Sequence, residues 1–194
     1  SQTFQIVSFT LKAFYFTFRT SIHPGGLNSE HGSTGHTQPQ TSLQLRRQGT
    51  EKRSGGYFPF ECLDQNVQLT FPASAFKSNG TAQVNVGLKK AIYDALRKID
   101  VLFENDTMPN SWDQKKIDDF RNIVYRLVEE NECVLNSSQA IEDDFSDREI
   151  LLDAYFKEMA DLLLQKEFSA CAWEVVRKET LRTLGFILQN PKGQ

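Results

Sequence analysis

The sequence predicts an all-α fold, a bundle of amphipathic helices around a single core. From residue 82 onward, apolar residues recur at spacings of three and four, which is the period of a helix with one buried face. The stretches SWDQ at 111–114 and SDRE at 146–149 each have the spacing of a capping box, a motif that begins helices. Helices joined by short loops can pack antiparallel, so these stretches predict one bundle.

The first two predicted helices cover residues 82–104 and 111–135. The buried stripe of the first consists of Leu88, Ala91, Ile92, Ala95, Ile99, Leu102 and Phe103. The buried stripe of the second consists of Ile117, Phe120, Ile123, Val124, Leu127 and Val128. The polar stretch NDTMPN at 105–110 separates the two helices. We therefore expect Phe120 to be a core residue.

The third and fourth predicted helices follow the second capping box and are separated by a break near Phe168. The stripe of the third consists of Leu152, Tyr155, Met159, Leu162 and Leu163. The stripe of the fourth consists of Trp173, Val176, Thr180, Leu184 and Ile187. Pro191 and Gly193 end the fourth helix. Trp173 and Val176 are therefore expected in the core.

The chain before residue 82 has a different composition. The segment 49–81 contains four residues that block helices, Gly55, Gly56, Pro59 and Pro72. Within it, FPFECLDQNVQLTF at 58–71 is predicted to be a packed loop, for which Cys62 can supply an anchor. Residues 21–41 have the composition of a linker, and residues 1–18 are apolar without a helical stripe.

Composition and charge exclude several classes of partner. The chain has 194 residues, of which 39% are hydrophobic, and this size fits one domain. A net charge of -3 gives no general attraction to nucleic acid or anionic lipid. No stretch has the roughly 18 to 20 uninterrupted apolar residues that a membrane-spanning helix needs. We expect no nucleic-acid partner and no membrane insertion.

The residue inventory does not favour an enzyme. The sequence lacks a nucleophile elbow, a phosphate loop, a kinase motif set and a metal-ligand cluster. The three histidines all lie in the predicted linker, at His23, His31 and His36. The paired carboxylates at 129–130 and 143–144 point about 100 degrees apart on a helix and are typical of a solvated face. We therefore predict a binding protein without catalytic residues, cofactor or metal.

The cysteines and glycosylation sequons bear on the compartment. Cys62, Cys133 and Cys171 lack the spacings of zinc or redox motifs, and an odd number permits at most one internal disulfide. Three N-glycosylation sequons begin at Asn79, Asn105 and Asn136. They favour secretion modestly.

The fourth predicted helix has a candidate contact surface. Leu181 lies among basic side chains, flanked by Arg177 and Arg182. An apolar side chain with arginine around it is a frequent composition of interaction hot spots. The alternative is a solvated helix face with ordinary i,i+4 neighbours. The residues alone favour neither reading.

Several motifs in order resemble the type I interferons. The strongest is CAWEVVRKE at 171–179, preceded by YFKEMADLLLQKEFSA. Upstream, the motifs that resemble the family are YFPFECL, LFENDTMPNSWD and DDFRNIVYRLVEENECV. Together the resemblance covers residues 42–190. It implies an up-up-down-down helical cytokine with long crossovers. It also implies a secreted monomer that engages two different type I interferon receptor chains, activates Janus kinases and STAT factors, and induces an antiviral state.

The resemblance implies roles for individual residues. In the family, the cysteine of the long loop pairs with the cysteine that opens the final helix, which here implies a disulfide between Cys62 and Cys171. One receptor chain contacts the loop after this cysteine and the final helix, positions that correspond here to Leu63, Arg177, Leu181 and Arg182. The other receptor chain contacts the opposite side of the bundle, where the best match is Tyr125.

The sequence also departs from the family at some of these surfaces. Asn66 stands where the family often has an arginine, and Lys178 where a smaller residue is common. Asp100 and Arg121 replace aromatic residues near the second surface.

The beginning of the chain departs further. Family members start with a cysteine that pairs with the one at Cys133, followed by a long first helix. This chain has no such cysteine, so Cys133 is predicted to be free, and only SLQLRR at 42–47 resembles the end of that helix. We therefore expect a divergent, poorly ordered segment at 1–41, the bundle at 42–190 with its first helix truncated or replaced, and a tail at 191–194. The alternatives are another cytokine of the interferon and interleukin-10 class, or an inactive interferon-like interaction protein.

Overall fold

The computed structural model describes residues 58–78, 82–135 and 143–189. The long helices are α3 (Ala82–Phe103), α4 (Gln114–Asn131), α5 (Phe145–Gln165) and α6 (Ala170–Gln189). The short 3-10 helices are η1 (Phe60–Gln65), η2 (Ala73–Phe76) and η3 (Glu132–Val134). The described ranges contain helices and no strand, so the predicted all-α class is confirmed. The expected segments 1–41 and 191–194 lie outside the described residues.

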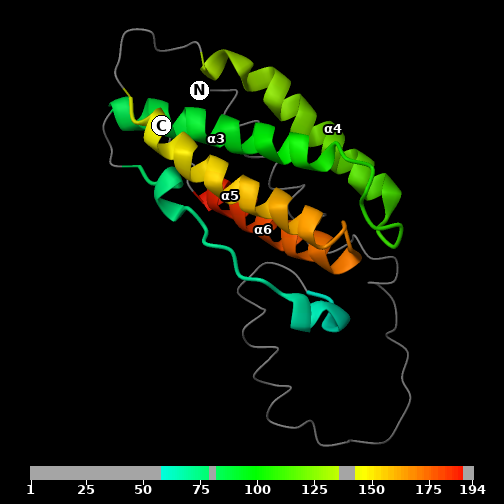
Figure 1. The fold of residues 1–194 in the computed structure, drawn as a ribbon. Coiled ribbons are helices and arrows are strands. Elements are labelled where there is room, and N and C mark those ends of the chain that lie inside the picture. The colour runs from blue at the N-terminus through cyan, green and yellow to red at the C-terminus, as the bar shows by residue number, and fades with distance from the viewer. Residues whose placement is uncertain (1–57, 79–81, 136–142, 190–194) are drawn as a thin grey trace, which may run out of the picture.

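The long helices run alternately in opposite directions (Figure 1). α3 and α5 are parallel neighbours, since Lys90 pairs with Asp143 near their starts and Lys98 with Asp153 further along. α4 and α6 run the other way. The order of α3, α4 and α6 fits the last three places of an up-up-down-down bundle, with α5 as an additional helix. The expectation that the first helix is truncated or replaced concerns residues outside the described ranges.

The two predicted capping boxes are wrong in detail, because aspartates supply the contacts instead. The N-cap of α4 is Asp113, whose carboxylate accepts a hydrogen bond from the Lys116 amide at 3.2 Å, and the predicted cap was Ser111. α5 begins at Phe145, after Asp144 in the N-cap position and ahead of the predicted cap at Ser146, and the Phe145 amide donates to the Asp143 carboxylate at 2.9 Å. Aspartate is as good an N-cap as serine, so the spacing alone did not distinguish them.

Aromatic side chains fill the centre of the bundle. The ring centroid of Phe103 lies 4.8 Å from that of Phe120 and 5.5 Å from that of Trp173. Trp112, in the loop before α4, packs edge-on against Trp173 at 6.1 Å. Phe120, Trp173 and Val176 are fully buried, at the positions where the sequence places core residues. Edge-to-face aromatic pairs add to the stabilisation that burial provides.

A tight turn reverses the chain between α5 and α6. Glu167 and Phe168 both have positive φ angles, 49° and 54°. The Phe168 amide donates to the Leu163 carbonyl at 2.8 Å, which satisfies a carbonyl at the end of α5. The expected break near Phe168 is therefore present, and it brings the start of α6 beside the end of α5.

The segment 58–78, here called the crossover, contains η1 and η2. Its last part, at η2, is fixed to α5. Arg148 is buried and donates hydrogen bonds to the carbonyls of Ala75, at 2.6 Å, and Lys77, at 2.9 Å. Asp144 accepts a further hydrogen bond from the same guanidinium at 2.8 Å. The crossover is therefore held at η2 by contacts that a planar guanidinium is suited to make.

Candidate interaction surface

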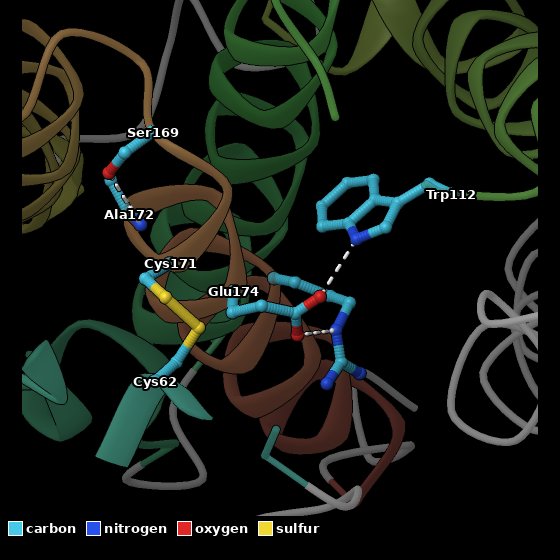
Figure 2. The surroundings of a disulfide bond; sticks show 7 residues. Cys62, Trp112, Ser169, Cys171, Ala172 and Glu174 are labelled. Carbon is cyan, nitrogen blue, oxygen red and sulfur yellow. Dashed lines mark hydrogen bonds and ion pairs between the residues drawn. A yellow bond between two sulfur atoms is a disulfide. The ribbon is translucent and has the colours of Figure 1, made fainter. Parts of the chain in front are cut away.

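The crossover begins with a disulfide to α6. Cys62 of η1 and Cys171 of α6 form this bond, with their Cα atoms 5.2 Å apart (Figure 2). The pairing that the resemblance implied is therefore present. Cys62 is buried in a small cluster with Phe58, Leu162 and Val175. Cys133, in η3 directly after α4, is a free and exposed thiol.

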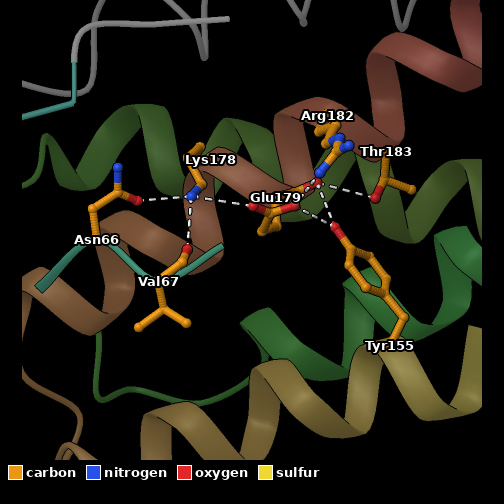
Figure 3. Close-up of polar contacts among 7 residues, drawn as sticks. All are labelled: Asn66, Val67, Tyr155, Lys178, Glu179, Arg182 and Thr183. Carbon is orange, nitrogen blue, oxygen red and sulfur yellow. Dashed lines mark hydrogen bonds and ion pairs between the residues drawn. The ribbon is translucent and has the colours of Figure 1, made fainter. Parts of the chain in front are cut away.

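A lysine bonds the middle of the crossover to α6. The ammonium of Lys178 donates to the Asn66 side-chain oxygen at 2.8 Å and to the Val67 carbonyl at 2.9 Å (Figure 3). The solvated helix face with ordinary i,i+4 neighbours, one of the two alternatives left open by the sequence, would include Lys178. That alternative is excluded for Lys178, because its side chain is only 12% exposed and reaches a segment more than a hundred residues away in the sequence.

Aromatic packing attaches the last part of the crossover. Phe71 lies with its ring centroid 4.4 Å from that of Phe186 and 5.5 Å from that of Tyr155. The guanidinium of Arg182 lies 4.7 Å from the centroid of the Phe71 ring, within the range of a cation–π interaction. The crossover therefore runs alongside α6 in the same direction, since residues later in the crossover contact residues later in α6. The two segments together form one continuous surface.

Burial of α6 changes the predicted contact patch. Leu181 is 1% exposed and Arg177 is 3% exposed, so neither presents its side chain on the surface. The expectation that both form an exposed patch with Arg182 is wrong. Leu181 belongs to the main hydrophobic core, and Arg177 is paired with the buried Glu174, so the buried face of α6 is wider than the apolar stripe predicted.

The buried Arg177 belongs to a polar network instead. Glu174 is also buried, and its carboxylate accepts hydrogen bonds from the Trp112 indole at 2.7 Å and from the Arg177 guanidinium at 2.8 Å (Figure 2). A buried charge is tolerated when it is paired and hydrogen-bonded. Trp112 thus links the loop before α4 to α6, a role that the sequence analysis missed because Trp112 precedes the helical stripe.

The exposed part of the surface comes mainly from the crossover. The side chain of Arg182 is 44% exposed, and Leu63 is partly buried against the disulfide cluster. Phe60, just before Cys62, is 73% exposed, which is unusual for a large aromatic side chain. Val67 is also exposed. Of the predicted contacts on this side, Arg182 and Leu63 are accessible together.

The other predicted contact, Tyr125, lies on α4 and is 56% exposed. In Figure 1, α4 lies on one side of the bundle and the crossover on the other. Arg121, one turn earlier, donates to the Glu104 carbonyl at 3.3 Å. Burial, together with the nearby Glu104 carboxylate, raises the pKa of Asp100, while Arg121 lowers it. Tyr125 is therefore an exposed aromatic side chain one helical turn from the positively charged Arg121.

Of the remaining predicted sites, some lie within the described residues and others lie outside them. Asn105 is exposed in the loop after α3, while Asn79 and Asn136 lie outside the described residues, as do the three histidines. Across residues 58–78, 82–135 and 143–189, no group of three His, Cys, Asp or Glu side chains is placed to hold a metal ion. Within the same ranges, no helix is both long and apolar enough to cross a membrane.

Comparison with known proteins gives a consistent result. A family model described as the interferon alpha/beta domain matches residues 38–190. The chain is 32% identical to interferon beta of Tachyglossus aculeatus aculeatus over 130 residues, which covers 66% of this chain and 68% of that protein. It is 36% identical to interferon a3 of Oncorhynchus mykiss over 125 residues, covering 62% and 65%. Among solved structures, zebrafish interferon 2 matches with a TM-score of 0.70 and 37% identity, covering 94% of this chain and 97% of that one.

Proposed function

Because the chain belongs to the interferon alpha/beta family, we propose that it is secreted and binds two different cell-surface receptor chains. Members of this family are cytokines, so the chain is an interferon-like cytokine and not an enzyme. Binding of two receptor chains by one molecule brings their associated Janus kinases together, and the kinases then activate STAT factors. The expected outcome in the responding cell is an antiviral state.

The observation that carries this proposal is the continuous surface of the crossover and α6. The crossover is held to α6 at three successive places, by a disulfide, a lysine and an aromatic cluster. A rigid surface loses little conformational entropy on binding, which favours a stable complex. We assign one receptor chain to this side, with Leu63 and Arg182 as direct contacts and Arg177 and Leu181 as supports beneath them.

The second receptor chain is assigned to the side that carries Tyr125. An exposed tyrosine supplies a large apolar area and a polar hydroxyl, and such residues are frequent in binding hot spots. Tyr125 lies on α4, and Arg182 packs against Phe71 of the crossover. Because α4 and the crossover lie on different sides of the bundle, one monomer has room for two different receptor chains (Figure 1). The receptors proposed are the type I interferon receptor subunits.

The test is receptor signalling. Zebrafish cells are used because the chain is similar to zebrafish interferon 2. After treatment with the purified, oxidised protein they are expected to show STAT phosphorylation within minutes. The variants Arg182→Ala and Tyr125→Ala should each raise the half-maximal concentration by about tenfold or more, because truncating a hot-spot residue costs more than about 1.4 kcal/mol. Lys157→Ala, which removes an exposed ion pair on α5, is the matched control and should signal like the original chain.

Absence of STAT phosphorylation with folded, disulfide-bonded protein would contradict the proposal. A signal that depends on an interleukin-10-class receptor instead would favour the other helical cytokines. The receptor dependence is measured by deleting each receptor gene in the responding cells.

A further inference from the structure

Beneath the crossover, the buried carboxylate of Glu179 lies at the centre of a polar network (Figure 3). The Tyr155 hydroxyl of α5 donates to this carboxylate at 2.8 Å. The ammonium of Lys178 lies 3.2 Å from it, and the guanidinium of Arg182 lies 3.5 Å from it. Glu179 is therefore a buried anion with one neutral donor on the core side and two cations on the surface side.

The network makes a continuous path from α5 to the crossover. Tyr155 contacts Glu179, Glu179 contacts Lys178, and Lys178 contacts Asn66. An ammonium group has three donors, and Lys178 has three oxygen partners here, from Asn66, Val67 and Glu179. The geometry of the lysine is therefore fully specified by groups on both segments.

The side-chain chemistry distinguishes this lysine from an ordinary surface cation. When a solvated lysine forms an ion pair, it loses rotamer entropy and the pair adds little to stability. Lys178 is largely buried, its counter-charge Glu179 is buried, and its contacts with Asn66 and Val67 cross between segments. Hydrogen bonds to charged groups in such settings are stronger than neutral ones, so loss of the ammonium should release the middle of the crossover.

We propose that Lys178 and Glu179 are positioning residues that hold the crossover segment 63–67 in the conformation used for receptor binding. Asn66 and Lys178, the two positions at which this sequence departs from the family at this surface, then act as one bonded unit. In this unit the positive charge is that of Lys178 on α6, whereas the family often has an arginine at the crossover position of Asn66. This inference rests on the proposed function, because it concerns the same surface.

The first test measures the conformation of the crossover without a receptor. Chymotrypsin cleaves after Leu69 and Phe71, and Leu69 is buried, so cleavage there requires the crossover to lift from α6. For Lys178→Met, cleavage at these two sites should be about tenfold faster, as expected for loss of hydrogen bonds to a charged group. Cleavage after Tyr125 requires local unfolding of α4, so it is the internal reference for general stability and should not change.

Three further variants separate positioning from general stability. Lys178→Arg keeps the positive charge and several donors, so it should restore slow cleavage. Glu179→Gln keeps a partner for Tyr155 but removes the counter-charge, so it should resemble Lys178→Met. Lys157→Met makes the same substitution at an exposed ion pair on α5 and should cleave like the original chain. All variants are compared below their melting temperatures.

The second test measures STAT phosphorylation in the responding zebrafish cells. Lys178→Met should raise the half-maximal concentration about tenfold, and Lys178→Arg should restore it. The positioning role is contradicted if chymotrypsin cleaves Lys178→Met after Leu69 and Phe71 as slowly as it cleaves the original chain. It is also contradicted if cleavage after Tyr125 accelerates by the same factor. It is also overturned if the crossover loosens and signalling does not change. If the original chain fails to signal, the proposed function fails, while the cleavage rates still decide whether Lys178 positions the crossover.

Discussion

Asp94 of α3 is a buried carboxylate whose environment only partly satisfies it. One of its oxygens lies 3.1 Å from the Lys98 ammonium, and among the described residues the other oxygen has no hydrogen-bond partner. Burial raises the pKa of Asp94, and the nearby Lys98 does not fully offset this. Burial also lowers the pKa of Lys98, but hydrogen bonds to Asp153 and Asp94 outweigh it and leave that pKa raised. The lysine is thus shared between two carboxylates, of which Asp94 is the more buried.

We expect Asp94→Asn to raise the melting temperature at neutral pH. A carboxyl group with a raised pKa binds its proton more tightly in the folded state, so folding becomes less favourable as pH rises through that pKa. Asparagine removes the buried charge, while Lys98 keeps its 2.6 Å contact with Asp153. The advantage of the variant should shrink as pH falls through the pKa of Asp94 in the folded protein.

The measurement is thermal unfolding of both proteins across the acidic and neutral range. Asp153→Asn is the control, because it removes the exposed carboxylate from the same lysine and should not raise the melting temperature. A lower melting temperature for Asp94→Asn at neutral pH would show that the pair with Lys98 outweighs the cost of burying Asp94.

At the scale of elements, a disulfide joins the crossover covalently to α6. The disulfide between Cys62 and Cys171 closes a loop with a sequence separation of 109. On the chain-entropy view, closing a loop of this length stabilises the folded state by about 4 to 5 kcal/mol. The disulfide also fixes Leu63 beside α6, so it should affect both stability and receptor binding.

We expect Cys171→Ser to lower the free energy of unfolding by about 4 kcal/mol and to reduce signalling strongly. Cys133→Ser changes the same atoms at a free, exposed thiol and should leave both properties unchanged. Denaturant unfolding and STAT phosphorylation are the two measurements. An unchanged midpoint and unchanged signalling for Cys171→Ser would refute the view that this bond is required.

Features that depend on residues close together in the sequence could be predicted, and features that depend on residues far apart in the sequence could not. The four long helices could be predicted because their stripes, such as the one containing Phe120, are local patterns. The contacts of Lys178 with the crossover could not, because they join residues more than a hundred positions apart in the sequence. The sequence offered one indication, since Lys178 and Asn66 both depart from the family.

At the scale of the whole molecule, the family resemblance predicted what local patterns did not. Helical periodicity is compatible with several bundle topologies, and it does not order the helices in space. The directions of α3, α4 and α6 follow the order that the resemblance implied (Figure 1). The pairing of Cys62 with Cys171 also came from the resemblance, since three cysteines alone permit three different single disulfides.

We expect glycosylation at Asn105 when the chain is secreted by vertebrate cells. Asn105 is exposed in the loop after α3, where a glycan would extend into solvent without displacing a helix. The measurement is the mass of the secreted protein before and after enzymatic removal of N-glycans. Asn105→Gln should lose the corresponding mass, and full-length secreted protein without any glycan at this site would contradict the prediction.

The single bond between Cys62 and Cys171 also has a consequence for the cell that makes the protein. Thiols stay reduced in the cytosol and are oxidised along the secretory route. A newly made chain therefore lacks the bond that fixes its contact surface until it has left the reducing environment. On the proposed secretory route the bond forms before the protein leaves the cell, so only material retained in the cytosol lacks it.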